Sequence, residues 1–189
     1  PDDAVVVSGN GTASIALFQA GRVKAGQRMF MNSGCAAMGY DLPAAIGACI
    51  ASRETPGAGP GTVVCVTGDG SIQMNIQELA TIAHHSLPIK IFVLNNGGYK
   101  SIRMTQDTYF EGRHNGAGFE SGVRFPDISK VATAYGLTGW QIRDHDLLEE
   151  QIQVALNYPH PLIVDVRLTP DYTFNKTDLS ALSARQAVI

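Results

Sequence analysis

Four apolar runs, each rich in β-branched residues, recur along the chain. They cover Ala4–Val7, Thr62–Thr67, Ile89–Leu94 and Leu162–Val166. Polar and apolar positions do not alternate within these runs, which is typical of strands that are buried on both faces in a parallel sheet. We therefore predict four strands of a sheet that helices cover on both sides.

Apolar residues at helical spacing fill the intervals around these strands. The predicted helices are Ala36–Arg53, Gln77–His85, Ile128–Tyr135 and Leu147–Leu156. Because strands and helices alternate, the pattern indicates an α/β fold, a three-layer doubly wound parallel sheet.

Three segments interrupt this alternation. Thr55–Gly61 has the composition of a Pro/Gly surface loop. Asp107–Arg124 is long, polar and rich in glycine, and a loop of that size in a compact domain is usually functional or mobile. The polar tail after Pro170 is expected to be loosely held.

Composition narrows the class of protein. A chain of 189 residues suits one domain, and 44% hydrophobic with 16% charged residues excludes disorder of the whole chain. The net charge of −3, without a long basic run, argues against a nucleic acid or an anionic membrane as partner. Cys35, Cys49 and Cys65 form neither a metal-type spacing nor a disulfide framework. We therefore expect a reducing, cytoplasmic setting and no membrane partner.

Glycines and small polar residues directly follow three of the predicted strands. These segments are Ser8–Thr12, Gly68–Ser71 and Asn95–Tyr99. Ligands of open α/β sheets lie beyond the carboxyl ends of the strands. We therefore expect the three segments to form one polar site.

The spacing of two of these segments predicts a cation site. Residues 71–94, 24 in number, separate Gly70 from Asn95, which is enough for one helix and one return strand. If the strands are neighbours, Asp69 and Asn96 face each other at strand ends about 5 Å apart. A carboxylate with amide and backbone oxygens suits Mg²⁺ or Ca²⁺, and Mg²⁺ with so few protein ligands shares its shell with phosphate oxygens. Glycines that allow close backbone approach, and a helix that starts there, favour a Mg²⁺–diphosphate site.

The same residues carry a resemblance to a known family. Gly68-Asp69-Gly70, followed after 24 residues by Asn95-Asn96, is similar to the thiamine diphosphate-binding motif. The surrounding sequence GDGSIQMNIQELATIAHHSLPIKIFVLNN resembles the acetohydroxyacid (acetolactate) synthase group of thiamine diphosphate-dependent enzymes. Similar segments lie at Ser33–Ala48, Phe125–Gly136 and Pro161–Arg167, so the resemblance covers most of the chain, from Val5 to Pro170. It identifies the chain as a C-terminal diphosphate-binding (PP) domain.

The resemblance implies ligands for the metal and the cofactor. Mg²⁺ would be bound by Asp69, Asn96 and the Gly98 carbonyl, together with two diphosphate oxygens and a water. The residues that would bind thiamine diphosphate are Asn10, Gly11, Thr12, Ala36, Met38, Gly68, Asp69, Gly70, Ser71, Asn96, Gly98 and Tyr99. Among them Met38 would have the catalytic role, because it would wedge between the two rings and hold the cofactor bent.

The resemblance also implies parts that this chain lacks. In the family, a glutamate of a separate pyrimidine-binding domain protonates the cofactor, and no glutamate here matches its motif. A pyrimidine-binding domain and a central domain usually precede the PP domain, and the sequence starts at Pro1 without an initiator methionine. We expect residues 1–189 to be the PP domain alone, a fragment or one half of a split enzyme, and inactive by itself. Its partners would be a 2-keto acid and a pyrimidine-binding domain of the same or another subunit, in a homo-oligomer.

Departures from the acetolactate synthase pattern concern the substrate. Thr105 replaces a tryptophan, and Ser101 replaces a methionine. Pyruvate decarboxylase-type enzymes have a glutamate where this chain has Ile102, and an apolar side chain cannot deliver a proton. We therefore expect Ile102 and Thr105 to face the substrate, and carboligation to be favoured over simple aldehyde release.

Three alternatives remain open at this point. The chain could belong to a 2-keto acid decarboxylase of another type, or to a non-catalytic module that binds a diphosphate. Residues 9–14 also approach the dinucleotide-binding pattern of a Rossmann domain, although Ser14 replaces its third glycine and no suitable acid lies about 20 residues on. A Rossmann domain would give no role to Asp69 and Asn96.

Overall fold

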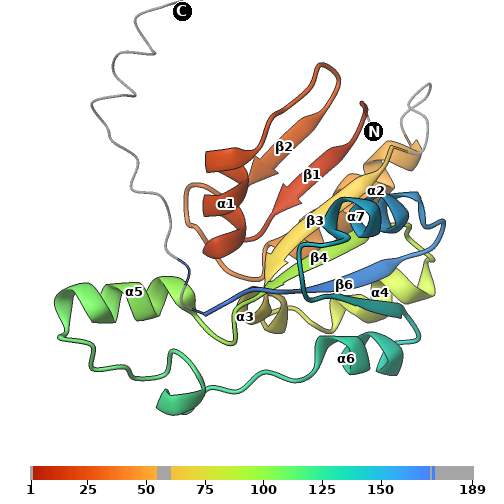
Figure 1. Ribbon diagram of the computed structural model, residues 1–189. Coiled ribbons are helices and arrows are strands. Elements are labelled where there is room, and N and C mark those ends of the chain that lie inside the picture. Colours follow the sequence, from red (N-terminus) through yellow and green to blue (C-terminus); the bar gives the residue numbers. More distant parts are fainter. Residues whose placement is uncertain (1, 55–60, 171, 173–189) are drawn as a thin grey trace, which may run out of the picture.

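A six-stranded parallel sheet forms the centre of the computed structural model, which describes residues 2–54, 61–170 and 172 (Figure 1). The strand order is β2-β1-β3-β4-β6-β5, and every pair of neighbours is parallel. The strands are β1 Val5–Ser8, β2 Arg28–Met31, β3 Val63–Gly68, β4 Lys90–Asn95, β5 Thr138–Ile142 and β6 Leu162–Arg167.

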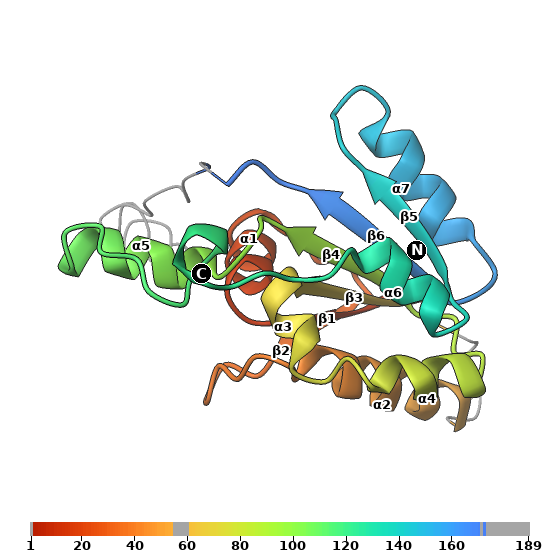
Figure 2. The ribbon, with the colours of Figure 1, turned by 90° about the horizontal axis from the view of Figure 1, so that it is seen from below.

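Helices cover both faces of the sheet. They are α1 Thr12–Ala20, α2 Asp41–Glu54, α3 Asp69–Gln73, α4 Glu78–His84, α5 Lys100–Tyr109, α6 Ile128–Ala134 and α7 Leu148–Asn157, with a short 3₁₀ helix, η1, at Phe119–Ser121. The strand connections that contain α1 and α7 lead towards the β2 edge of the sheet, and those that contain α2, α4 and α6 lead towards the β5 edge. Because crossovers between parallel strands are right-handed, α1 and α7 lie on one face of the sheet and α2, α4 and α6 on the other. Figure 2 shows α2 and α4 on one side of the sheet and α7 on the other. The result is the three-layer doubly wound sheet that the sequence predicts.

Two apolar clusters hold these layers together. The larger one packs α2, α4 and α6 on the sheet, and its fully buried members include Leu42, Leu79 and Ile91. The smaller one packs α7 against β5 and β6 through Ile142 and Ala155, among others. The larger cluster lies directly under the strands that lead to the expected site.

The four predicted strands and three of the four predicted helices lie where the sequence placed them, within two residues at each end. The prediction for Ala36–Arg53 is wrong at its start, because Ala36 and Gly39 have φ angles of 49° and 85°, and α2 begins only at Asp41. The sequence analysis missed β2 and β5. Both are short edge strands of mainly half-buried residues, and the apolar run of β2 is only three residues long while β5 mixes polar and apolar residues.

The segment Asp107–Arg124 is less irregular than the sequence suggested. Its first three residues belong to α5, and η1 lies within it. The loop predicted at Thr55–Gly61 and the tail after Pro170 lie outside the described residues, except for Gly61 and Tyr172. Within the described part of the chain, no helix is long and apolar enough to cross a membrane.

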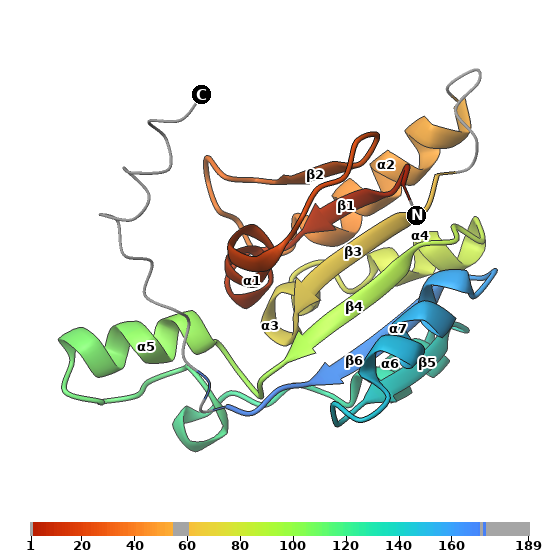
Figure 3. The ribbon, with the colours of Figure 1, turned by 45° about the horizontal axis from the view of Figure 1, so that its top comes forward.

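The chain reverses its direction across the sheet between β1 and β3. After β1 it runs to β2 on one side, and after β3 it runs to β4 on the other. Such a switch point opens a crevice at the carboxyl ends of the strands, where doubly wound proteins bind their ligands. Figure 3 shows the carboxyl ends of β1, β3 and β4 on the side of the molecule from which α5 projects.

Leu79→Ala tests the larger cluster. Leu79 has no exposed surface, so we expect the variant to lose about 3 kcal/mol of unfolding free energy, measured by urea denaturation. Val154→Ala is the matched control, because Val154 is 51% exposed and its truncation should cost about 0.5 kcal/mol or less. Equal losses in the two variants would contradict this packing.

Candidate functional site

A cavity of about 380 Å³ opens at the switch point. This volume lies within the usual range for sites that bind small molecules. All twelve residues expected to bind the cofactor line it, together with Ile102. The structure thus brings together residues from four separate segments of the sequence.

The segment after β1 forms one wall through backbone groups. Gly11 has a φ angle of 80° and directly precedes α1, so the first free N–H groups of that helix lie at the cavity. The side-chain amide of Asn10 donates to the carbonyl of Ala37 over 2.7 Å. Asn10 therefore anchors the segment before α2 with one of the two N–H groups of its amide, which leaves the other for a ligand.

The segment before α2 presents the two residues expected at the aminopyrimidine. Ala36 has a left-handed φ of 49°, an uncommon conformation for a residue with a side chain. Met38 follows with 39% of its surface exposed, although it is apolar. A large apolar side chain held half-open at a cavity fits a role in supporting a flat, apolar ligand group.

Asp69 lies at the end of β3 and is 2% exposed. Its two carboxylate oxygens accept from the backbone N–H groups of Gly70 at 2.9 Å and Gly98 at 3.0 Å. Burial raises the pKa of this carboxyl from 3.8 to about 6, while the backbone hydrogen bonds and the charge of Arg103 oppose that shift. Among the described residues, no cationic side chain forms an ion pair with Asp69.

Asp41 is a residue that the sequence analysis missed. It is fully buried, and its carboxylate accepts from the hydroxyls of Thr67 at 2.7 Å and Ser71 at 2.6 Å, and from the Leu42 N–H at 2.9 Å. Because the Ser71 hydroxyl gives its proton to Asp41, it cannot donate to a diphosphate, so only the Ser71 backbone N–H remains for that role. The sequence Asp41-Leu42-Pro43 is a helix-start signal that would have placed Asp41 at the start of α2.

Asn96 follows β4 and is 5% exposed. Its amide nitrogen donates to Thr12 Oγ1 and to the Tyr172 hydroxyl, each at 3.2 Å. Its side-chain oxygen, the atom expected on the metal, accepts from Arg103 at 3.2 Å. The sequence analysis missed Arg103. Its side chain reaches Asn96 only because α5 is folded, and the sequence does not show this contact.

Gly98 and Tyr99 complete the cavity wall. Gly98 has a φ angle of 152° and forms an isolated antiparallel bridge with Gly118. The Tyr99 ring lies against Gly70, since a Cβ atom added there would lie 2.3 Å from the ring. A side chain at Gly70 would thus displace Tyr99, which explains the glycine after Asp69.

The two expected substrate residues lie in different places. Ile102 lines the cavity and is 40% exposed. Thr105 lies one turn further along α5, outside the cavity, and lines an adjacent hollow of about 230 Å³ that shares Ile15 and Ser101 with it. Its hydroxyl donates to the Ser101 carbonyl at 3.0 Å. The structure thus places Ile102 at the cavity and Thr105 beside it.

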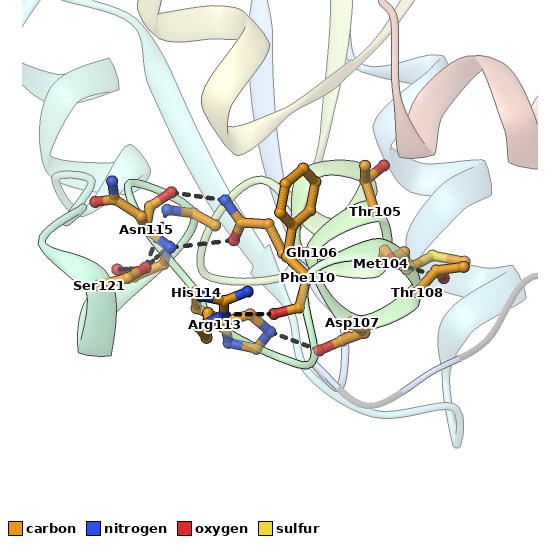
Figure 4. A network of polar contacts seen from close by, with 12 residues as sticks. Met104, Thr105, Gln106, Asp107, Thr108, Phe110, Arg113, His114, Asn115 and Ser121 are labelled. Atoms are coloured by element: carbon orange, nitrogen blue, oxygen red, sulfur yellow. Dashed lines mark hydrogen bonds and ion pairs between the residues drawn. The ribbon is translucent and has the colours of Figure 1, made fainter.

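Side-chain contacts hold the loop after α5 against the helix (Figure 4). Gln106 donates to the Asn115 carbonyl at 2.9 Å and accepts from the Asn115 N–H at 3.2 Å. His114 contacts Asp107 at 2.6 Å, and both side chains are partly exposed. His114 does not line the cavity.

The donor set fits a hard cation that shares its shell with an anion. Asp69 is a buried carboxylate whose charge is offset only by N–H groups and a more distant arginine. The described residues contain no group of three or more His, Cys, Asp or Glu side chains that could hold a metal alone. A divalent cation here would therefore need oxygens from a bound ligand, as Mg²⁺ commonly does with phosphates.

Comparison with known proteins agrees with this geometry. The family model for the thiamine pyrophosphate enzyme C-terminal TPP binding domain matches residues 9–166. The acetolactate synthase large subunit of Haemophilus influenzae is 42% identical over 143 residues, which are 75% of this chain and 23% of the relative. The acetolactate synthase of Arthrospira platensis is 37% identical over 150 residues, which are 79% of this chain and 24% of the relative. The chain thus spans about a quarter of the length of the curated relatives it matches.

The raised pKa of Asp69 predicts a pH-dependent stability. Because the folded pKa of about 6 exceeds the ordinary 3.8, protonation of Asp69 stabilises the folded state. This contribution is complete below pH 3.8 and is lost as the pH rises through 6. Between pH 4.5 and 7.5 in a chelating buffer, we expect the parent to lose about 2 kcal/mol more unfolding free energy than Asp69→Ala. Parallel pH profiles of the two proteins would contradict this prediction.

Proposed function

Because the chain belongs to the thiamine pyrophosphate enzymes, as an acetolactate synthase-like C-terminal TPP binding domain, we propose that it binds the Mg²⁺–diphosphate end of thiamine diphosphate in a 2-keto acid decarboxylase or carboligase. The observation that carries the proposal is the cavity at the switch point, where buried Asp69 lies among glycines and helix N-termini. A Rossmann-type dinucleotide site is disfavoured, because the strand order differs from 3-2-1-4-5-6.

Each wall of the cavity has a distinct task in this proposal. Asp69, the Asn96 side-chain oxygen and the Gly98 carbonyl would hold Mg²⁺. The backbone N–H groups at the start of α1 and the Ser71 N–H in α3 would receive the diphosphate, since helix N-termini favour anions and the Gly70 N–H already donates to Asp69. Ala36 and Met38 would support the aminopyrimidine ring.

The cofactor, when bound, supplies the electron sink for cleavage or formation of the bond next to the 2-keto group. This chain would orient it and keep water from the diphosphate. Ile102 would present an apolar surface to the substrate and has no proton to give, which favours carboligation over aldehyde release. A 2-keto acid decarboxylase of another type is the second candidate, because Thr105 and Ser101 differ from the acetolactate synthase pattern.

We further propose that a pyrimidine-binding domain of the same or another subunit covers this cavity. Met38, at 39%, and Ile102, at 40%, are more exposed than is usual for apolar residues that line a binding site. Helix α5 has no buried residue in the structure. A second domain on this side would exclude water from the reacting end of the cofactor. A cytoplasmic homo-oligomer accommodates such an arrangement.

Asp69→Ala tests the metal site. Loss of the sole charged ligand should weaken binding of thiamine diphosphate to the full-length enzyme by at least about tenfold in Mg²⁺ buffer, since even outer partners of metal ligands contribute that much. Calorimetry with and without Mg²⁺ measures this. Asp146→Ala, at an exposed position, is the control and should bind like the parent. Unchanged affinity in Asp69→Ala would remove Asp69 from the site.

The purified 189-residue chain is expected to fold and yet to be silent with 2-keto acids. Its two apolar clusters provide a core, but the proposed pyrimidine-binding domain and its glutamate would lie outside these 189 residues. The assay is CO₂ release from pyruvate and longer 2-keto acids with Mg²⁺ and saturating thiamine diphosphate. Turnover would show that the catalytic acid lies within these residues.

A further inference from the structure

The turn between β4 and α5 contains two glycines, and hydrogen bonds from their N–H groups to Asn95 and Asp69 supply part of its restraint. Gly97 and Gly98 both have positive φ angles, 72° and 152°, which residues with side chains rarely adopt. This turn nevertheless carries Asn96 and Gly98, which the proposed function assigns to the metal. A flexible backbone can hold ligands in place only if other groups restrain it.

Arg103 restrains the first residue of the turn. Its Nη2 atom donates to both the backbone carbonyl and the side-chain oxygen of Asn96, each at 3.2 Å. Because a guanidinium has only donors, the amide atom that faces Arg103 must be the oxygen. The amide nitrogen is thereby turned towards Thr12, so Arg103 determines which way the Asn96 side chain faces.

The loop after α5 restrains the other end of the turn and makes room for Arg103. The Tyr99 N–H donates to the Ala117 carbonyl at 2.8 Å, and Gly98 bridges to Gly118. A Cβ atom on Gly118 would lie 3.1 Å from Nη1 of Arg103, tighter than an ordinary contact. Gly118 has an extended backbone, with φ −173°, which any residue can adopt. Glycine is needed here because a side chain would crowd Arg103, and not because of the backbone conformation.

Two polar anchors keep this loop in position. The Ser121 hydroxyl accepts from the N–H groups of Ala117 and Gly118, both at 3.0 Å. Gln106 holds the Asn115 backbone through two hydrogen bonds, as Figure 4 shows. Both the loop and Arg103 are therefore held on α5, and both contact the turn before this helix.

We propose that Arg103 is a positioning residue for the metal site, which fixes the orientation of the Asn96 amide and the path of the Asn96–Tyr99 turn from behind the cavity. The inference rests on the proposed function. It goes beyond it by assigning a role to a residue that does not line the cavity.

The direction in which Mg²⁺ affinity changes in an Arg103 variant distinguishes a positioning role from a simple effect of charge. Removal of a positive charge near a cation would, through electrostatics alone, tighten Mg²⁺ binding. Loss of positioning would weaken it. In Arg103→Met holoenzyme at saturating thiamine diphosphate, we expect the apparent dissociation constant for Mg²⁺ to rise about tenfold, as for other partners of metal ligands. Arg103→Lys keeps the charge and should fall between Arg103→Met and the parent.

Arg143→Met is the matched control, because Arg143 is an exposed arginine whose side chain bonds to Gln141 on β5. It should leave Mg²⁺ affinity unchanged. Hydrogen exchange without metal or cofactor gives a second reading, in which the amides of Gly98 and Tyr99 should exchange faster in Arg103→Met than in Arg143→Met. This reading does not depend on activity.

Gly118→Ala tests the same contact from the other side. The new methyl group should push the Arg103 side chain from Asn96 and raise the Mg²⁺ dissociation constant. In the Arg103→Met background it should have no further effect, so the two substitutions should be non-additive.

Three results would overturn the proposal: tighter or unchanged Mg²⁺ binding in Arg103→Met, an equal loss in Arg143→Met, or additive effects of the two substitutions. If the parent itself shows no Mg²⁺-dependent binding of thiamine diphosphate, the proposed function fails first. If the parent binds and Arg103→Met binds equally well, only the role of Arg103 fails.

Discussion

The carboxylate of Asp41 joins the segments on which the cavity depends. It is fully buried at the start of α2, and it accepts hydrogen bonds from Thr67 at the end of β3 and from Ser71 in α3. The same carboxylate leaves no space for a side chain on Gly9, since a Cβ atom there would lie 2.2 Å from Oδ2. Asp41 therefore packs against the end of β1 as well as against β3 and α3.

Asp69 lies only two residues beyond Thr67, but its donors differ. Two side-chain hydroxyls and a backbone N–H donate to Asp41, whereas among the described residues only backbone N–H groups donate to Asp69, and burial raises its pKa to about 6. A buried carboxylate in this state is costly unless it is protonated or meets a cation. One acid thus serves the fold, and the other is left available for a ligand.

The sequence predicted the central part of this arrangement well. The long apolar runs of β3, β4 and β6 determine the sheet, and the spacing between Asp69 and Asn96 correctly implies adjacent strands. The edge strands were missed because β2 has an apolar run of only three residues, none of them β-branched, and β5 mixes polar and apolar residues. Asp41 could not be assigned a role, since Thr67 and Ser71 lie 26 and 30 residues along the chain and no local spacing records these contacts. Arg103 lies only seven residues after Asn96, but no sequence pattern shows that its side chain folds back to the turn before α5.

The exposed character of α5 has a consequence for how such proteins diversify. No residue of this helix is buried, so exchanges at Ser101, Ile102 or Thr105 would leave the interior intact. The cavity floor, by contrast, is made of glycines and backbone groups whose replacement would disturb the chain itself. In the proposed function α5 faces the substrate, so its side chains can be exchanged with little cost to folding, whereas exchanges in the cavity floor would alter both folding and cofactor binding.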